Sequence, residues 1–313
     1  MKPALFLLAA LSLWGQSGAL SPAAEFNLNA NLKHRPSRTA LPFLAANPKG
    51  LTLVTVEEDC VSLASADLAG RILHARSDLA SVRAQIYEAL PLPDGSVWIV
   101  ARGPYQLLTK GFGGFVPNAG PSAGDDFQEL DRYDPAGKAI SSVRLLSRTD
   151  AEVPIAAAGD VLVVRAALRG AEGFPANEAT VRFGTVDSGR FRQTAEVPLP
   201  PPPHSAIAVL TARGDLWLIG KLTGNVEVVD PKTGGVAVLP TGTPHPVVAA
   251  AADPDSLYVL AADTVLKMDL AGKRLATYRL QFGRGFQPAA LAVTGDALYL
   301  ADRAGRTECF RIH

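Results

Sequence analysis

The sequence predicts an all-β protein, specifically a six-bladed β-propeller with four-stranded antiparallel blades. Two repeated patterns predict it: a short turn containing Asp and Gly, and a pair of apolar runs whose second member begins with a large residue. A third observation, an alternating segment soon after an apolar leader, predicts how the ring closes. Copies of one β unit repeated along a chain are typical of blades stacked around an axis.

The first pattern is a turn that occurs five times. An Asp is followed two to four residues later by a Gly, usually with a basic residue behind it. An Asp side chain can bond the backbone two residues on, and Gly adopts positive φ without a Cβ clash, so each copy predicts a hairpin turn. The copies are Asp67–Arg71, Asp134–Lys138, Asp187–Arg190, Asp230–Gly234 and Asp269–Lys273.

The second pattern precedes each turn and gives six units, each with a small apolar strand, a tight turn and a strand with a large residue near its start. We name the four strands of a unit A to D from the axis outward. Small residues suit strand A, because six A strands crowd around one axis. The units begin at Leu41–Val54, Ala89–Val100, Pro154–Val164, Ala206–Ile219, Val247–Leu260 and Ala289–Leu300.

Large residues form one column in strand B of the six units. Such a stripe can be a stacking platform for sugars or bases, but its regularity favours packing between blades. We therefore interpret it as structural. The column is Leu53, Trp98, Leu162, Trp217, Tyr258 and Tyr299.

The ring is expected to close through the N-terminus. The last unit ends at Arg311–His313, after its strand C. The segment Glu25–Leu32 alternates apolar and polar residues, as a half-buried strand does. We expect this N-terminal strand to complete the last blade as strand D, which removes exposed sheet edges.

The first 24 residues have the layout of a secretory signal peptide. Lys2 supplies a positive charge, Ala4–Trp14 is an apolar stretch too short to span a bilayer, and Ser17–Ala19 offers small residues for cleavage. We expect cleavage at about residues 19–24 and a single propeller domain at 25–313. With no later transmembrane segment, the mature protein is expected to be secreted or periplasmic.

Charge and cysteine positions argue against a nucleic-acid-binding protein and against a disulfide bridge. The net charge is zero with scattered basic residues, which argues against nucleic acid as a partner. An exported protein can carry a disulfide. However, the repeat alignment puts Cys60 at the turn entering one third strand and Cys309 at the far end of another. That separation exceeds the roughly 7 Å Cα limit for a disulfide, so we expect no bridge.

Two motifs carry a family resemblance over Leu41 to the C-terminus. Pro93-Asp94-Gly95 precedes Trp98, and Asp134–Lys138 reads Asp-Pro-Ala-Gly-Lys. These motifs resemble those of the six-bladed propellers that include NHL-repeat and YncE-like proteins. The resemblance implies the fold, but the group spans binding scaffolds, lactonases and lyases, so it does not fix a function.

In such propellers the D-to-A and B-to-C connections emerge on one face. Two B-to-C loops of this chain are long and belong to neighbouring blades, at Gly103–Asp126 and Arg169–Glu178. Loops of this length without their own structure are usually functional or disordered. They supply one set of candidate binding residues: Tyr105, Lys110, Phe115 and Phe174.

A second candidate site is the mouth of the central channel. His204, His245 and Gln287 share one column at the start of strand A, with Gln85 as their counterpart in the second blade. Two imidazoles and two amides could hold a polar ligand or a divalent cation. Alternatively they only cap strand starts, since both histidines stand beside prolines. No other cofactor is expected.

Charges near the ends of strand B are unevenly shared among the blades. Basic residues occur in the second to fourth blades and acidic residues in the others. This could orient a dipolar ligand or partner, although solvated turn residues explain it as well. The residues are Arg102, Arg165 and Lys221 on one side and Glu58, Asp59, Asp263 and Asp302 on the other.

The leading functional hypothesis is an exported, non-enzymatic module that recognises a protein, peptide or glycan through the loop-rich face. There is no Gly-x-Ser-x-Gly motif, no convincing carboxylate pair and no zinc cluster, so no catalytic residue is predicted. The alternative is a metal-assisted, lactonase-like hydrolase or lyase at the channel mouth. A third possibility is a structural subunit of an envelope complex.

Overall fold

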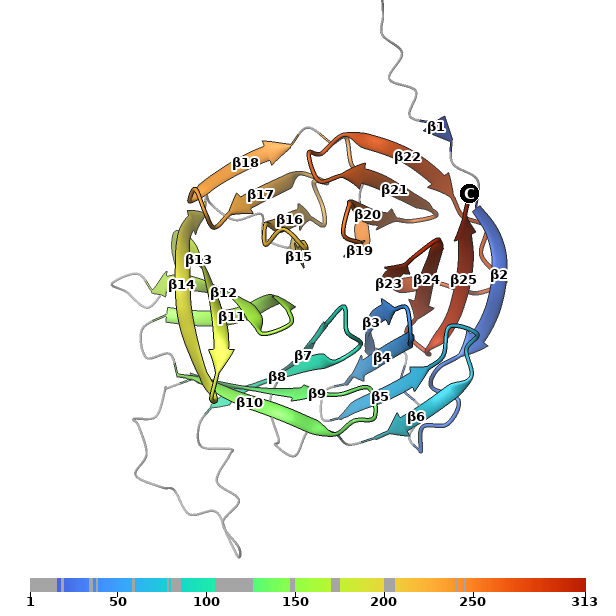
Figure 1. The fold of residues 1–313 in the computed structure, drawn as a ribbon, viewed down its shortest axis with the longest axis horizontal. Helices are drawn as coiled ribbons and strands as arrows, with labels where there is room; N and C mark the ends of the chain where they lie inside the picture. Colours follow the sequence, from blue (N-terminus) through green and yellow to red (C-terminus); the bar gives the residue numbers. More distant parts are fainter. Residues whose placement is uncertain are drawn as a thin grey trace, which may run out of the picture.

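A computed structural model gives the fold. It describes residues 16–17, 20–33, 36–37, 39–57, 60–77, 79, 86–104, 126–146, 150–169, 175–199, 206–239, 241–244 and 246–313. Six sheets surround a central axis (Figure 1), each built on four antiparallel strands, which in five of the sheets follow in sequence order from the axis outward. The predicted six-bladed propeller is therefore confirmed.

The first three blades are formed by consecutive strands. Blade 1 consists of β3 (Leu41–Asn47), β4 (Gly50–Val56), β5 (Val61–Ala66) and β6 (Ile72–Arg76). Blade 2 consists of β7 (Ile86–Pro91), β8 (Val97–Pro104), β9 (Asp126–Tyr133) and β10 (Ala139–Leu146). Blade 3 consists of β11 (Asp150–Ala158), β12 (Val161–Arg169), β13 (Pro175–Asp187) and β14 (Arg190–Leu199).

The last three blades complete the ring. Blade 4 consists of β15 (Ala206–Leu210), β16 (Leu216–Gly220), β17 (Val226–Asp230) and β18 (Gly235–Leu239). Blade 5 consists of β19 (Val247–Ala252), β20 (Ser256–Ala261), β21 (Thr264–Asp269) and β22 (Arg274–Arg279), with the short β1 (Gln16–Ser17) added in parallel to β22. Blade 6 consists of β23 (Pro288–Thr294), β24 (Ala297–Asp302), β25 (Arg306–Ile312) and β2 (Leu20–Asn27).

The N-terminal strand closes the last blade, as predicted, but it lies earlier in the chain than expected. Strand β2 pairs antiparallel with β25 (Figure 1) and shares only Glu25–Asn27 with the predicted segment. The strand ends because the Asn27 side chain accepts a hydrogen bond from the Asn29 N–H at 2.9 Å and starts a turn. Leu28, in the turn that follows, is fully buried. The alternation of apolar and polar residues therefore extended beyond the strand into the turn, which is why the predicted segment was placed too late in the chain.

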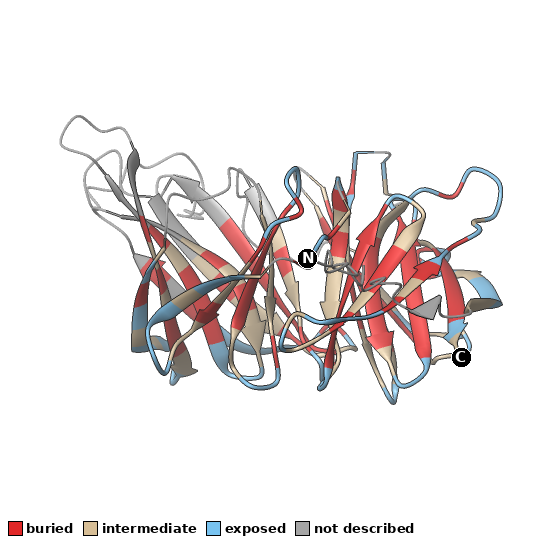
Figure 2. Ribbon diagram, turned by 90° about the horizontal axis from the view of Figure 1, so that it is seen from above, coloured by how far each residue is buried: buried red, intermediate tan, exposed pale blue. Residues whose placement is uncertain are grey.

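Six apolar clusters hold the ring together, one between each pair of neighbouring blades. Buried residues run through the strands while the turns are exposed (Figure 2). Trp98, Trp217, Tyr258 and Tyr299 pack toward the following blade. The structural interpretation of the stripe is therefore confirmed.

The stripe is not one column in all six blades. Leu53 and Leu162 pack toward the preceding blade instead, and their neighbours Val54 and Val163 face the following blade. The sequence alignment was wrong by one residue in these two blades. Since neighbouring strand residues point to opposite faces, such a shift changes the face.

Four of the five Asp-Gly turns adopt the predicted geometry, in which the Asp carboxylate accepts a hydrogen bond from the N–H two residues on. The exception is Asp187, whose two-residue turn has positive φ at both Ser188 (51°) and Gly189 (74°). The Asp67 carboxylate accepts hydrogen bonds from the N–H groups of Ala69 (3.1 Å) and Arg71 (2.9 Å), and Gly70 has a φ of 84°. Asp302 makes the same pair of bonds in a further turn, between β24 and β25, which is not one of the five predicted copies.

Both cysteines are free, as expected. Cys309 is buried in the cluster between blades 6 and 1, opposite Tyr299 of β24. Burial raises the pKa of the Cys309 thiol, so this thiol is held in its protonated form.

Substitution of Gly70 should be more damaging than substitution of Gly234. Both have positive φ (84° and 69°), which is strained for an alanine by about 1–2 kcal/mol. A Cβ on Gly70 would also collide with the ring of Phe26 in β2, whereas Gly234 faces open space. We expect Gly234→Ala to cost about 1 kcal/mol and Gly70→Ala about 2–3 kcal/mol in urea unfolding. Equal losses would contradict the contact between β2 and this turn.

The structure narrows the expected cleavage position of the leader. Cleavage after Ala19 leaves β2 whole, whereas cleavage after Ala24 removes five of its eight residues and exposes the β25 edge. If the predicted leader is cleaved, we therefore expect the mature chain to begin at Leu20, which its intact mass will show. An N-terminus at Glu25 in a folded, monomeric product would contradict a closing role for β2.

Among the described residues there is no helix long and apolar enough to cross a membrane.

Candidate functional site: the central channel

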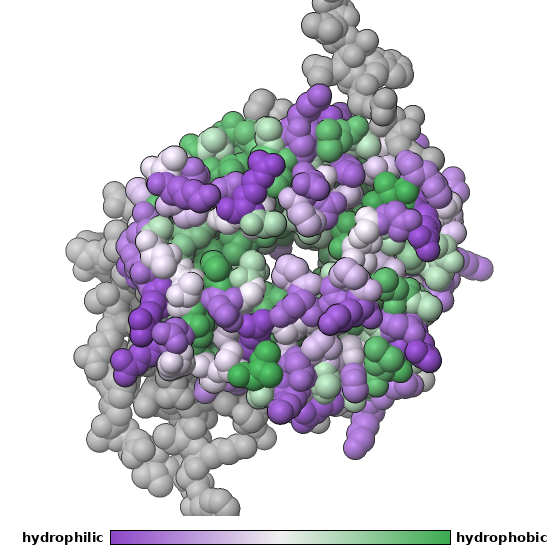
Figure 3. All heavy atoms as spheres, viewed as in Figure 1, coloured by the Kyte–Doolittle hydropathy of each residue, from purple (hydrophilic) through white to green (hydrophobic). Residues whose placement is uncertain are grey.

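The first strands of all six blades enclose a channel of about 960 Å³. Viewed along the axis, the molecule is hollow at its centre, with hydrophobic residues inside the hollow and mainly hydrophilic ones on the surrounding face (Figure 3). The described lining is mostly Ala, Val, Leu and Pro. Propellers place small residues here because strands crowd around the axis, and this accounts for the alanines.

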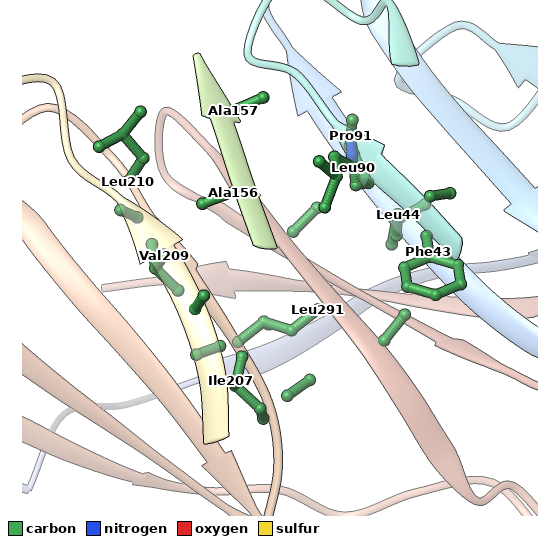
Figure 4. Close-up of a pocket in the computed structure, with 18 of the residues that line it drawn as sticks. Phe43, Leu44, Leu90, Pro91, Ala156, Ala157, Ile207, Val209, Leu210 and Leu291 are labelled. Atoms are coloured by element: carbon green, nitrogen blue, oxygen red, sulfur yellow. The ribbon is translucent and has the colours of Figure 1, made fainter. Parts of the chain in front are cut away.

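Larger aliphatic side chains also contribute to the wall. Leu90, Ile207, Leu210 and Leu291 come from three different blades and project around the same space (Figure 4). Every residue of β15 is only half-buried, so part of its apolar surface is exposed to the channel. A concave, mainly apolar space with a few polar groups is typical of a ligand-binding site.

The channel extends sideways between blades 3 and 4. In the other blades, the described lining residues come from the first strands and the turns that follow them, with Arg303 as the exception. Blades 3 and 4 additionally contribute residues from second, third and fourth strands, and blade 4 also contributes Lys221 from the turn after β16. We call this set the side pocket, and it consists of Arg165, Leu199, Leu218, Lys221 and Glu227.

Arg165 occupies a position that is apolar in the other five blades. It follows Val163 by two residues, so it faces blade 4 from β12. The described chain offers Arg165 no hydrogen bond or ion pair, and its Nε is buried without a partner. The equivalent residues Val56, Val100, Ile219, Leu260 and Ala301 are all buried in inter-blade clusters.

Glu227 lies on the opposite wall of the side pocket. It pairs with Leu218 in blade 4, whose side chain packs toward blade 3. The Glu227 Oε2 is buried without a hydrogen-bond partner in the part of the chain described, and burial raises the pKa of this carboxyl.

Glu308 of blade 6 occupies the position equivalent to Glu227, and its carboxylate does have a hydrogen-bond partner. It pairs with Leu300 as Glu227 pairs with Leu218, but it accepts a hydrogen bond of 3.0 Å from the N–H of Gly283 in the connection before its blade. The connection before blade 4 begins with four prolines, Pro200–Pro203, which have no N–H to donate.

Most of the predicted site residues lie outside the described residues. Gln287 is described and exposed, and it borders a smaller cavity of about 370 Å³ together with Asp302 and Arg303. No group of three or more metal-ligating side chains occurs in the described chain, so the cation hypothesis stays a prediction. The predicted residues outside the described ones are Gln85, Tyr105, Lys110, Phe115, Phe174, His204 and His245.

Of the residues in the predicted division into basic and acidic blades, only two of the described ones, both basic, line the channel. Arg165 and Lys221 line the side pocket, as the basic side of the pattern suggested. Asp263 instead pairs with Arg279, and Asp302 pairs with Arg306 within a turn. Glu227 was missed because it stands within a third strand, where a single charge in an apolar run carries no motif.

The fold and the channel define the class of protein: the chain is a six-bladed β-propeller with an apolar central cavity. No protein-family model matches it, and no protein of curated function matches its sequence. Similar solved folds are virginiamycin B lyase from Staphylococcus aureus (TM-score 0.49, 14% identity, 95% of this chain and 100% of the lyase) and BamB from Moraxella catarrhalis (0.41, 12%, 94% and 100%). U3-55K is also similar (0.48, 12%, 88% and 78%). These likenesses concern the propeller fold alone.

The unpartnered Glu227 should make stability depend on pH. Because its folded-state pKa is raised, its contribution to stability is fully present below the unfolded value of 4.5 and is lost as pH rises through the folded value. We expect Glu227→Gln to melt at a higher temperature than the native protein at pH 7 and at the same temperature near pH 4.

Glu196 provides a matched control with the opposite sign. Hydrogen bonds with Thr180 and Gln193 and its pair with Arg182 outweigh desolvation and lower its pKa. Glu196→Gln should therefore destabilise the protein at neutral pH and lose this effect as pH falls below the unfolded value. A Glu227→Gln variant that behaves like Glu196→Gln would show that Glu227 has a stabilising partner.

Proposed function

We propose that the protein is an exported binding module whose central channel accepts an apolar segment of a peptide. The observation that carries this proposal is the channel itself, about 960 Å³ enclosed by aliphatic side chains of six blades. Burying two or three aliphatic side chains of a peptide there would contribute about 1.5–3 kcal/mol each. Before the cost of association is subtracted, this sum of about 3–9 kcal/mol corresponds to millimolar to micromolar affinity, which is therefore an upper limit for the apolar contacts alone.

The lining favours a peptide over a glycan. Sugar rings are commonly held on exposed aromatic faces, but Trp98, Trp217 and Tyr258 are almost fully buried between blades. Phe43 is the only aromatic side chain among the described residues of the channel. The walls therefore offer apolar contact without a stacking surface.

The lining also favours binding over catalysis. Of the described channel residues, Thr294 alone carries a hydroxyl group, and none is His or Cys. The Asp253 carboxylate is already used by its turn, where it accepts hydrogen bonds from Ser256 N–H and the Tyr258 hydroxyl. The described wall thus lacks a hydroxyl or thiol nucleophile beside a histidine base.

The test is capture of peptides by the channel. A synthetic library of random octapeptides is incubated with the protein, and the retained peptides are identified by mass spectrometry. We expect enrichment of peptides with two or more Leu, Ile, Val or Phe residues. Ala250→Phe, which narrows the channel at β19, should reduce the captured amount at least tenfold.

A matched variant controls for the added ring. Ala271→Phe places the same side chain on the exposed turn between β21 and β22 and should capture as much as the native protein. Circular dichroism confirms that both variants are folded. Equal capture by the native protein and Ala250→Phe would show that the channel is not the binding site.

A further inference from the structure

We propose that the side pocket between blades 3 and 4 binds the C-terminal carboxylate of the peptide. Arg165 and Lys221 hold the carboxylate, and Glu227 accepts a hydrogen bond from the last amide N–H. This inference rests on the proposed function and identifies which part of the peptide the site recognises. It starts from three charged residues of the lining, two of which, Arg165 and Glu227, bury a side-chain atom that has no hydrogen-bond partner in the described chain.

Arg165 is the main anchor. A guanidinium at a position that five other blades fill with buried aliphatic residues loses hydration and packing without a compensating bond. A ligand carboxylate would supply that bond, because the planar guanidinium matches a carboxylate through two parallel N–H donors. The unpartnered Nε is one of the donors available for this geometry.

Lys221 adds a second positive charge at the rim. It follows the last residue of β16, and its backbone carbonyl accepts a hydrogen bond from Val247 N–H at 2.8 Å, which ties its backbone to the start of β19. Its side chain is exposed. Water and salt screen an exposed ammonium, so its contribution should be smaller than that of Arg165.

Glu227 makes the pocket selective for a peptide end over a simple alkyl carboxylate. A ligand carboxylate close to Glu227 would be repelled unless a donor stood between the two acidic groups. In a peptide, the last N–H lies two bonds from the terminal carboxylate carbon and provides this donor, whereas an alkyl carboxylate has none. The net charge of Arg165, Lys221 and Glu227 together is +1, which is neutralised by one ligand carboxylate.

The test compares two octapeptide libraries that differ only at their ends, one with free carboxylates and one with C-terminal amides. We expect the native protein to retain the free-carboxylate library at least tenfold better. Arg165→Leu should abolish this preference, and Lys221→Gln should weaken it two- to fivefold. Arg71→Gln, which removes an exposed arginine on a turn outside the channel, serves as the matched control and should change nothing.

We expect the Arg165→Leu variant to fold, since the equivalent positions of the other blades carry Val, Ile, Leu or Ala. We expect its melting temperature to rise by about 2–4 °C as the interface between blades 3 and 4 gains apolar contact. A variant that melts lower than the native protein would show that Arg165 stabilises the fold, and the inference would then be wrong.

The possible results separate the two proposals. Equal retention of both libraries by the native protein would overturn the carboxylate assignment and leave the apolar channel as the binding site. Retention of neither library would remove the proposed function and the inference with it. Displacement of bound peptides by decanoate as effectively as by free octapeptides would show that the peptide N–H, and hence Glu227, does not contribute to recognition.

Discussion

Packing between neighbouring blades is the interaction on which the whole molecule depends. A single four-stranded blade cannot bury both of its faces, and each of the six apolar clusters draws residues from two blades. The ring must therefore be closed, because an open end would leave one face and one sheet edge exposed to water. Strand β2 provides the closure by adding N-terminal residues to the blade made by the C-terminus.

The sequence predicted the parts of this fold that depend on local chemistry. Asp67 and Gly70 form their turn with bonds that lie within a few residues, so the pattern was readable from the chain alone. Registers that depend on neighbouring blades were harder to predict. Leu53 and Leu162 were assigned to the wrong face because a strand that is buried on both faces, such as β4, gives no clear alternation from which to choose a face.

The site was less predictable than the fold, for a physical reason. Arg165 and Lys221 stood out as charges near strand ends, yet an isolated charge in a sequence does not show whether a partner lies across an interface. Glu308 and Glu227 occupy equivalent positions, but Gly283 N–H satisfies only the first. That difference depends on the connection between two blades, and single-sequence patterns do not contain it.

The side pocket shows how a ring of repeated units can host a specific site. Val163, Leu216 and Leu218 still pack where blades 3 and 4 meet near the short turns, so the interface remains closed at that end. Toward the opposite end, Arg165 stands where the other blades carry an apolar residue, and together with Glu227 it lines a space beside the channel. Five well-packed interfaces can compensate for one that is weaker, because ring closure links all six blades. A closed propeller can therefore place unpaired charges between two blades at a stability cost that an isolated pair of sheets would not tolerate.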